Sequence, residues 1–237
     1  MVLVRTRNPL NIGAVARAMS NFGFSRLRLV QPYDLAFREA RSAVGASEIL
    51  AQAEVFDHVA QAIADCILVI GTTVGRSRDL EQPTRMLPQA AEVIQRRLRG
   101  GPVAVLFGSE KRGLSNEDLS YCHWLLRIPT NEQHPSMNLA QSVAVVLYDL
   151  SRQMAGVSRL PSGSNDGVAS PANMQLLQQM TNVMMQALKE SGYAKSGSEA
   201  AEEKLRQLMG RMQLSHDDAE VWTGMFRQIL WKLRKSE

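Results

Sequence analysis

The stretch that most constrains the fold runs from Ile128 to Leu150, where a polar loop leads into a nearly all-round apolar helix. Pro129 and Pro135 fix φ and lack amide donors, so the loop that they bracket cannot be regular secondary structure. From Asn138 onward, apolar residues recur at every third or fourth position and also fill much of the opposite side. Such a helix has to be buried, which requires other elements on several of its sides.

Two polar residues stand where this loop meets the helix. Ser136 and Asn138 precede the first apolar turn, where backbone amides are free and the helix dipole favours a polar ligand. Ser and Asn are also common helix caps, so the pair has a purely structural interpretation. The junction therefore predicts either a ligand site or a cap.

Apolar runs elsewhere predict strands that alternate with helices, as in an α/β domain. The expected strands are Val2–Val4, Leu27–Val30, Cys66–Ile70, Val103–Phe107 and Leu125–Ile128. Helices are expected at 12–22, ending near Gly23, at 87–98, and within the alanine-rich region 36–64, where Ile49, Ala53, Val59 and Ile63 have helical spacing. In a parallel sheet of this kind, ligand-binding loops follow the carboxyl ends of the strands.

The last third of the chain has a different composition. Residues 156–171 are rich in Gly, Ser, Pro, Asn and Asp, which predicts a flexible linker. Amphipathic helices are expected at 172–189, 199–212 and 215–235, the last with Ser215 and Asp218 at the spacing of a capping box. Its expected core stripe is Trp222, Met225, Phe226, Ile229, Leu230 and Leu233. We expect an α/β domain at 1–155 and a small all-α extension at 172–237 that the linker lets reach away.

Composition narrows the class of protein. With 237 residues and 45% hydrophobic content, the chain can bury a sizeable core. No apolar run approaches the roughly 20 residues that span a bilayer, and the N-terminus does not read as a signal peptide, so we expect a cytoplasmic protein with no membrane segment. Cys66 and Cys122 are expected as reduced core thiols, and no Cys or His spacing predicts a metal site. The net charge of +4 suits a polyanionic partner but is too mild to establish one.

An ordinary dinucleotide-binding domain is the natural competitor for an α/β pattern. The loop after the first strand, however, lacks the G-x-G-x-x-G fingerprint. It reads N-x-G-x-x-x-R from Asn11 to Arg17 instead. A nucleotide-dependent oxidoreductase is therefore disfavoured.

Two further motifs follow in order, each after an expected strand. Residues 107–114 read F-G-S-E-K-R-G-L, and residues 135–140 read P-S-M-N-L-A. Together with the segment from Asn11 to Arg17, they resemble the three motifs of the SPOUT family of RNA methyltransferases, in its TrmH-like, 2'-O-methylating branch. The first motif and the helical extension resemble the TrmJ subgroup of that branch, whose N-x-G-A/S-V-A-R-A-M pattern is matched from Asn11 to Met19.

This resemblance implies a fold and an activity. The fold is an α/β SPOUT domain with a parallel sheet and a deep C-terminal trefoil knot, acting as a homodimer. The activity is S-adenosylmethionine-dependent 2'-O-methylation of tRNA, at the cytidine or uridine of position 32 in the anticodon loop, without a metal. Methylation of another tRNA or ribosomal RNA nucleotide is the alternative, and a non-catalytic RNA-binding module is a further one.

The resemblance also assigns residues to roles. The catalytic set is Asn11, Arg17, Glu110, Ser136 and Asn138. The cofactor is expected near Thr72, Gly108, Ile128, Met137 and Leu139. RNA contacts are expected at Arg76, Arg78, Lys111, Arg112, Arg227, Lys232, Arg234 and Lys235. Because a guanidinium keeps its proton in proteins, we expect Arg17 to orient phosphate and stabilise developing negative charge rather than to act as a base.

Overall fold

A seven-stranded parallel sheet forms the centre of the part of the chain that is described. The structure is a computed structural model and describes residues 1–34, 37, 48–74, 82–157, 170–193 and 199–235. The strands are β1 Val2–Val4, β2 Arg28–Val30, β3 Glu54–Phe56, β4 Leu68–Thr72, β5 Thr84–Met86, β6 Val103–Phe107 and β7 Trp124–Arg127. Their order across the sheet is β3-β2-β1-β6-β4-β7-β5, and every pairing is parallel.

The helices follow the local signals of the sequence. They are α1 Pro9–Asn21, α3 Glu48–Ala51, α4 Val59–Ala62, α5 Leu87–Leu98, α6 Asn116–Ser120, α7 Leu139–Val157, α8 Met174–Glu190, α9 Glu199–Met212 and α10 His216–Arg234. The Asn8 side chain caps α1 by accepting from the Leu10 amide at 3.0 Å. Gly23 follows this helix with a φ of 77°, the left-handed conformation that glycine adopts without strain.

All five expected strands are present, and two more were missed. The region 36–64 was predicted as helical, but within its described part β3 separates the short helices α3 and α4. The spacing of apolar residues did not reveal β3, because it is an edge strand whose Glu54 and Val55 are exposed. Glu54 lies opposite Arg28 in the ladder and accepts a hydrogen bond from its Nε at 2.9 Å, a cross-strand pair that no local pattern reveals. β5 is likewise a short, exposed edge strand.

Side chains alternate between two buried faces of the sheet. In β1, Leu3 belongs to one apolar cluster, whereas Val2 and Val4 belong to another. Parallel strands buried on both faces read as continuous apolar runs, which is why these strands were visible in the sequence.

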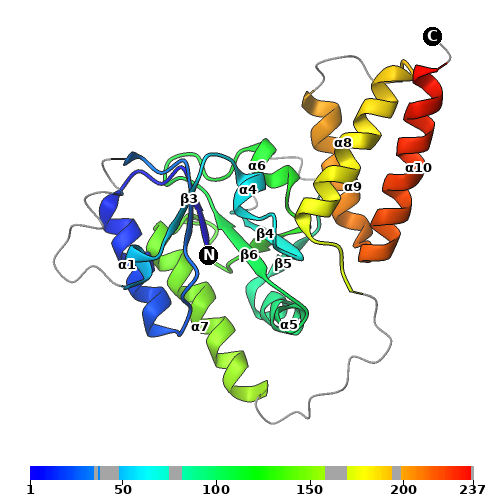
Figure 1. Cartoon of the computed structure of the whole chain (residues 1–237). Coiled ribbons are helices and arrows are strands. Elements are labelled where there is room, and N and C mark those ends of the chain that lie inside the picture. The colour runs from blue at the N-terminus through cyan, green and yellow to red at the C-terminus, as the bar shows by residue number, and fades with distance from the viewer. Residues whose placement is uncertain (35–36, 38–47, 75–81, 158–169, 194–198, 236–237) are drawn as a thin grey trace.

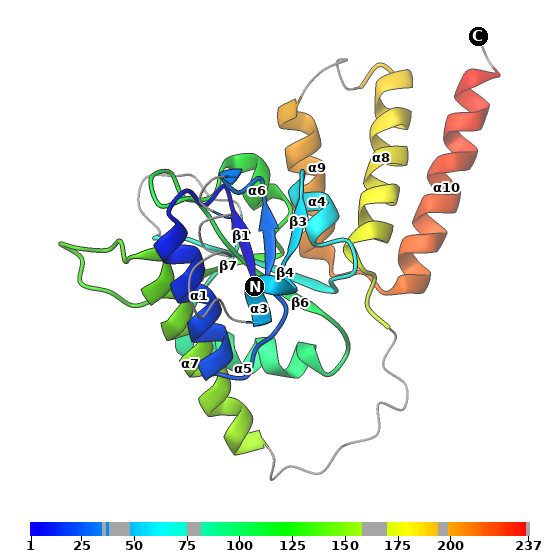
Figure 2. The same ribbon diagram turned by 60° about the vertical axis from the view of Figure 1, so that its left-hand side comes forward.

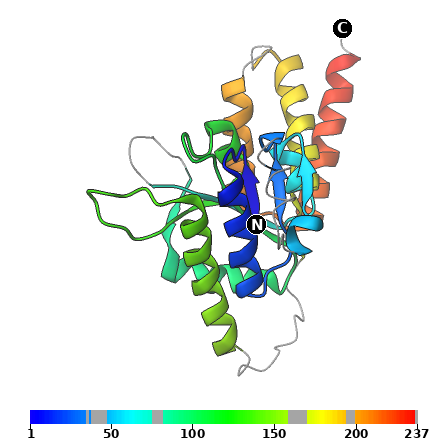
Figure 3. The same cartoon turned by 90° about the vertical axis from the view of Figure 1, so that its left-hand side faces the viewer.

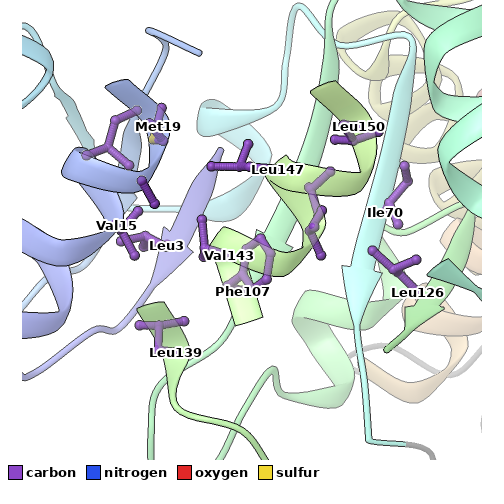
Figure 4. Packing of buried hydrophobic residues seen from close by; sticks show 14 of the residues in the cluster. Leu3, Val15, Met19, Ile70, Phe107, Leu126, Leu139, Val143, Leu147 and Leu150 are labelled. Carbon is purple, nitrogen blue, oxygen red and sulfur yellow. The ribbon is translucent and has the colours of Figure 1, made fainter. Parts of the chain in front are cut away.

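The first face is covered by α1, α5 and α7, and α7 packs against both of the others. Figure 3 shows α1 and α7 side by side in front of the sheet. Their side chains meet those of the strands in one core, which includes Val15, Leu147 and Phe107 (Figure 4). α7 buries the side of the helix that carries Val143, Leu147 and Leu150 in this core. Tyr148 on its other side is 56% exposed, so the expected all-round burial is wrong within one chain. The threading of this helix through a loop to form a knot remains a prediction of the resemblance.

The second face is covered by α4, α6 and the helical extension. α8, α9 and α10 stand together beside the sheet, on the side away from α1 and α7 (Figures 1 and 2). Met174, Leu177 and Met180 of α8 share one apolar cluster with Val2 and Leu125 of the sheet. The backbone amide of Met174 also donates to the carbonyl of Cys66 at 2.9 Å. The expectation that the extension reaches away from the α/β domain is therefore wrong, because its helices complete the core of that domain.

Three of the six residues in the apolar stripe expected on the last helix are exposed, and only Leu230 is buried. α10 buries Ala219, Thr223 and Leu230 against α8. Trp222 is 39% exposed, Met225 55% and Ile229 48%. Helical spacing identified an amphipathic helix, but α10 is the outermost helix and uses a narrower stripe.

Both cysteines are free and buried, as expected. Burial raises the pKa of the Cys66 thiol to about 12. Among the helices described, none has the length and apolarity needed to cross a membrane.

Candidate active site

A cavity of about 350 Å³ opens at the carboxyl ends of the adjacent strands β4, β6 and β7. The residues that follow these strands form its walls, as expected for a parallel sheet. All five residues expected to contact a cofactor line it: Thr72, Gly108, Ile128, Met137 and Leu139. Glu110 and Ser136 from the catalytic set also line it. The sheet thus brings together residues that are far apart in the sequence.

The loop after β6 depends on two glycines. A Cβ on Gly108 would lie 2.0 Å from the carbonyl carbon of Gly113, so any side chain there would push the loop open. Gly113 has a φ of 67°, and its amide donates to the carbonyl of Ser109 at 2.8 Å. This tight turn accounts for the glycines of the second motif and places Glu110 at its tip.

The carboxylate of Glu110 organises the loop that follows β1. It accepts hydrogen bonds from the backbone amides of Arg7 and Asn8, each at 3.2 Å, and from Asn11 Nδ2 at 2.9 Å. Burial by itself would raise the pKa of this carboxyl, but the bonds from Asn11 and from backbone amides outweigh it and hold the pKa below its ordinary value. Glu110 is therefore an anion that ties the first motif to the second.

Asn138 connects the third motif to the same network. Its Nδ2 donates to Asn11 Oδ1 at 3.0 Å, and its Oδ1 accepts from the Ala140 amide at 2.9 Å. The structural interpretation of this residue as a helix cap is thus correct, and the same side chain also bonds to Asn11 of the first motif. Glu110, Asn11 and Asn138 form one continuous chain of hydrogen bonds through all three motifs.

A second hollow adjoins the cavity at this chain of hydrogen bonds. It is lined by Arg7, Asn8, Pro9, Asn11, Glu110, Lys111, Met137, Asn138 and Leu139. Four of these residues, Glu110, Lys111, Met137 and Leu139, also line the cavity. Two molecules could therefore meet over the hydrogen-bonded chain, one in each hollow, which is the arrangement that a group transfer requires.

Arg17 lies apart from both hollows. It is exposed on α1 and does not appear among the described residues that line either space. It follows Asn11 by six residues, which corresponds to roughly 9 Å along the helix axis. Within one chain, the structure therefore does not bring Arg17 to the other candidate catalytic residues.

The candidate RNA-binding residues that the structure describes lie in two places. Lys111 and Arg112 are exposed and line the cavity. On α10, Arg227 and Lys232 are exposed, Lys235 lies 4.2 Å from the centre of the Trp231 ring, and Arg234 pairs with Glu190 of α8 at 2.8 Å. Arg76 and Arg78 lie outside the described residues.

Several residues of the two hollows were missed. Leu114 and Leu119 line the cavity, and Arg7 lines the second hollow. Leu119 lies on α6, whose start is marked in the sequence by Ser115 and Asp118 at capping-box spacing. That signal could have located the helix. Within the described ranges, no group of three or more His, Cys, Asp or Glu side chains could hold a metal ion.

Comparison with known proteins agrees with this geometry. Residues 1–148 match the model of the SpoU rRNA Methylase family. The chain is 32% identical over 232 residues to the tRNA (cytidine/uridine-2'-O-)-methyltransferase TrmJ of Pectobacterium atrosepticum, covering 97% of this chain and 95% of that protein. It is 33% identical to the TrmJ of Sodalis glossinidius, over 97% of this chain and 90% of the other.

Solved structures give the same result. The crystal structure of TrmJ from Z. mobilis ZM4 superposes with a TM-score of 0.81 at 33% identity, covering 96% of this chain and 97% of that one. The match extends through the helical extension, and the resemblance to TrmJ found in the motifs is confirmed. The chain belongs to the SpoU rRNA Methylase family.

Proposed function

We propose that the protein transfers a methyl group from S-adenosylmethionine to the ribose 2'-hydroxyl of a cytidine or uridine in tRNA. The observation that carries this proposal is the pair of adjacent hollows joined by Glu110, Asn11 and Asn138, in a chain similar over its length to TrmJ enzymes. Position 32 in the anticodon loop is the proposed target, on the resemblance of the first motif and the extension to the TrmJ subgroup.

The cavity suits S-adenosylmethionine in size and chemistry. Its volume of about 350 Å³ falls in the range of roughly 300–1,000 Å³ typical of small-molecule sites. Leu114, Leu119 and Ile128 offer apolar walls for an adenine ring. Thr130 and Ser136 add hydroxyl groups for its polar parts. When bound, this cofactor supplies an electrophilic methyl group on a sulfonium.

The second hollow is then the place of the substrate ribose. Methyl transfer forms a bond between the 2'-oxygen and the methyl carbon and breaks the sulfur–carbon bond, while the hydroxyl proton leaves to water. The side-chain amides of Asn11 and Asn138 are hydrogen-bonded at 3.0 Å and line this hollow. In that position they can orient the ribose. A guanidinium beside the 2'-oxygen would stabilise the negative charge that develops on it.

We propose that this guanidinium is Arg17 of a second copy of the chain. Arg17 lies outside the hollows of its own chain, on the exposed face of α1. That face also carries Leu10, which is 79% exposed, and the neighbouring α7 carries Tyr148, which is 56% exposed. A homodimer that packs through α1 and α7 would cover both apolar side chains and bring each Arg17 toward the partner's site.

The proposed division of labour follows the chain. Residues 1–155 hold the catalytic machinery, residues 156–171 connect the two parts, and residues 172–237 add tRNA contacts. Arg227, Lys232 and Lys235 of α10 offer exposed cations for tRNA phosphates, together with Lys111 and Arg112 at the cavity. Binding to tRNA should therefore weaken steeply with salt.

Calorimetry tests the cofactor proposal directly. S-adenosylmethionine should bind the full-length protein, and NAD should show no binding. Binding of NAD alone would favour a nucleotide-dependent oxidoreductase and would end this proposal. Mass-spectrometric mapping of tRNA and ribosomal RNA after reaction would then decide between position 32 and another nucleotide.

Mixing two inactive chains tests the shared site. Arg17→Ala should abolish turnover while leaving cofactor affinity within about twofold, because Arg17 lies outside the cavity. A mixture of Arg17→Ala and Asn138→Ala chains should recover part of the activity, since a mixed dimer contains one intact site. A monomer by light scattering, or no recovery after subunit exchange, would refute the homodimer proposal.

A further inference from the structure

The short helix α6 forms part of the cavity wall. It follows the tight loop of Gly108–Leu114 directly, and Leu114 and Leu119 from this segment line the cavity with 3% exposure each. A displacement of α6 would therefore reshape the apolar wall proposed to hold the adenine. Each end of this helix is held by an arginine from a different part of the chain.

The first end is held from the loop after β1. The buried carboxylate of Asp118 accepts from the Ser115 amide at 2.6 Å and from the Ser115 hydroxyl at 2.8 Å, and it pairs with the guanidinium of Arg5. Arg5 has a φ of 54°, a conformation that a residue other than glycine rarely adopts. The surrounding contacts must therefore hold it in place.

The second end is held from the helical extension. Arg206 of α9 donates from Nε to the Ser120 hydroxyl at 2.9 Å, and its guanidinium lies 4.6 Å from the centre of the Tyr121 ring. Its Nη1 donates to Glu202 at 2.6 Å. The Arg206 side chain is only 10% exposed, so these contacts are made with little competition from water.

The extension approaches α6 closely at this point. Met209 of α9, 4% exposed, shares the second apolar cluster with Leu119 and Cys122. A Cβ on Gly210 would lie 3.7 Å from the Cys122 carbonyl oxygen, so the two backbones are near neighbours here. α9 is thus packed closely against the end of α6, and this packing fixes the position from which Arg206 contacts α6.

We propose that Arg206 is a positioning residue that couples the helical extension to the cofactor cavity through α6. This inference rests on the proposed function, in which the cavity takes S-adenosylmethionine. The extension then has a second role besides tRNA contact, because its packing sets the position of the Leu114 and Leu119 wall. Cofactor affinity should depend on a residue that does not touch the cofactor.

The test uses full-length Arg206→Ala and Arg206→Lys proteins, titrated with S-adenosylmethionine in a calorimeter. Arg206→Ala should weaken binding roughly tenfold, and Arg206→Lys should recover part of the loss because it keeps a cationic donor near Ser120 and Glu202. The KM for the cofactor should rise with little change in kcat at saturation. Lys204→Ala, on an exposed position of the same helix, should bind within twofold of wild type.

One control and one further variant separate positioning from general destabilisation. Met185→Ala removes a side chain that is 4% exposed in α8 and should lower stability without weakening cofactor binding. If Arg206→Ala does not fold, Ser120→Ala removes the other partner of the contact and should weaken binding in the same direction. Unchanged affinity in the Arg206 variants, or an equal loss in Met185→Ala, would overturn the coupling. Failure of the wild-type protein to bind S-adenosylmethionine would instead overturn the proposed function.

Discussion

The side-chain amides of Asn11 and Asn138 are hydrogen-bonded at 3.0 Å, although 127 positions separate them in the sequence. Asn11 also donates to Glu110, so one chain of contacts links the loops after β1 and β6 to the start of α7. This chain of contacts fixes the three side chains relative to one another, which in the proposed reaction would lower the entropic cost of orienting cofactor and ribose.

Glu110→Gln should break this chain at its centre. The carboxylate now accepts hydrogen bonds from three N–H donors. A glutamine would turn its own N–H group toward at least one of them, and that hydrogen bond would be lost. Hydrogen bonds to a charged group contribute about 1.5–3 kcal/mol, so kcat/KM for tRNA methylation should fall roughly 10- to 100-fold. Glu92→Gln, on an exposed position of α5, is the matched control and should keep full activity. Equal activity of the two variants would contradict the organising role of Glu110.

Gly108→Ala should close the cavity to its ligand. The added methyl group would overlap the backbone of Gly113, and the loop would have to move. We expect at least a roughly tenfold loss of S-adenosylmethionine affinity by calorimetry. Gly224→Ala on α10 is the matched control, since its Cβ would have no neighbour within 4 Å. This control should bind normally and should gain roughly 0.5–1 kcal/mol in stability.

Met180→Ala should destabilise the sheet as well as the extension. Met180 is fully buried in the cluster that α8 shares with the strands, and such a truncation costs about 2–4 kcal/mol. Replacing Trp222 and Trp231 by Phe leaves Trp124 of β7 as the sole fluorescence reporter of the sheet. The urea midpoint of the Trp124 fluorescence transition should fall in Met180→Ala. It should stay nearly constant in the control Leu208→Ala, because the Leu208 side chain is 44% exposed. If Met180→Ala left the urea midpoint of the Trp124 fluorescence transition unchanged, the extension would fold independently of the sheet.

Burial of His123 should make stability depend on pH. Burial lowers the pKa of this imidazole from 6.5 to about 4, and its Nδ1 accepts from the Val69 amide at 3.1 Å. Between these values the unfolded chain binds more protons than the folded one, so the free energy of unfolding should fall as the pH decreases from 6.5 to 4. The loss should reach roughly 3 kcal/mol by linkage.

His123→Asn isolates this contribution. An asparagine Oδ1 can accept from the same amide but does not titrate. Urea unfolding at several pH values should show a shallower dependence for the variant, while other acidic and basic groups titrate equally in both proteins. Parallel curves for variant and wild type would mean that His123 takes no part in the dependence.

Much of the sheet could be predicted because its central strands are buried on both faces and therefore read as apolar runs. β3 and β5 could not, since they are exposed edge strands whose stability comes from pairing with residues distant in sequence, as in the contact of Glu54 with Arg28. The packing of the extension could not be predicted either. The spacing of apolar residues showed that its helices are amphipathic, but it did not reveal which side of each helix is buried or which element covers it. Trp222 and Met225, for example, were expected in the core and are exposed.

Some residues of the candidate site could likewise be predicted from the sequence, and others could not. Residues within a motif, such as Gly108 and Asn138, could be placed because motif order and strand ends bring them to one edge of the sheet. Residues that support the site from outside the motifs could not, because Arg206 meets Ser120 across 86 positions and only through the docking of α9. Arg17 was assigned from resemblance alone, and the geometry of one chain leaves it apart.

The most direct test of the account is methyl transfer to tRNA transcripts that differ by one oxygen atom. With labelled S-adenosylmethionine, an unmodified transcript should gain one methyl group, mapped by nuclease digestion and mass spectrometry to the ribose of nucleotide 32. A transcript with 2'-deoxycytidine at that position alone should gain none, while its binding at low salt should be nearly unchanged. Equal labelling of the deoxy transcript, or a methyl group mapped to a base, would contradict 2'-O-methylation at this nucleotide.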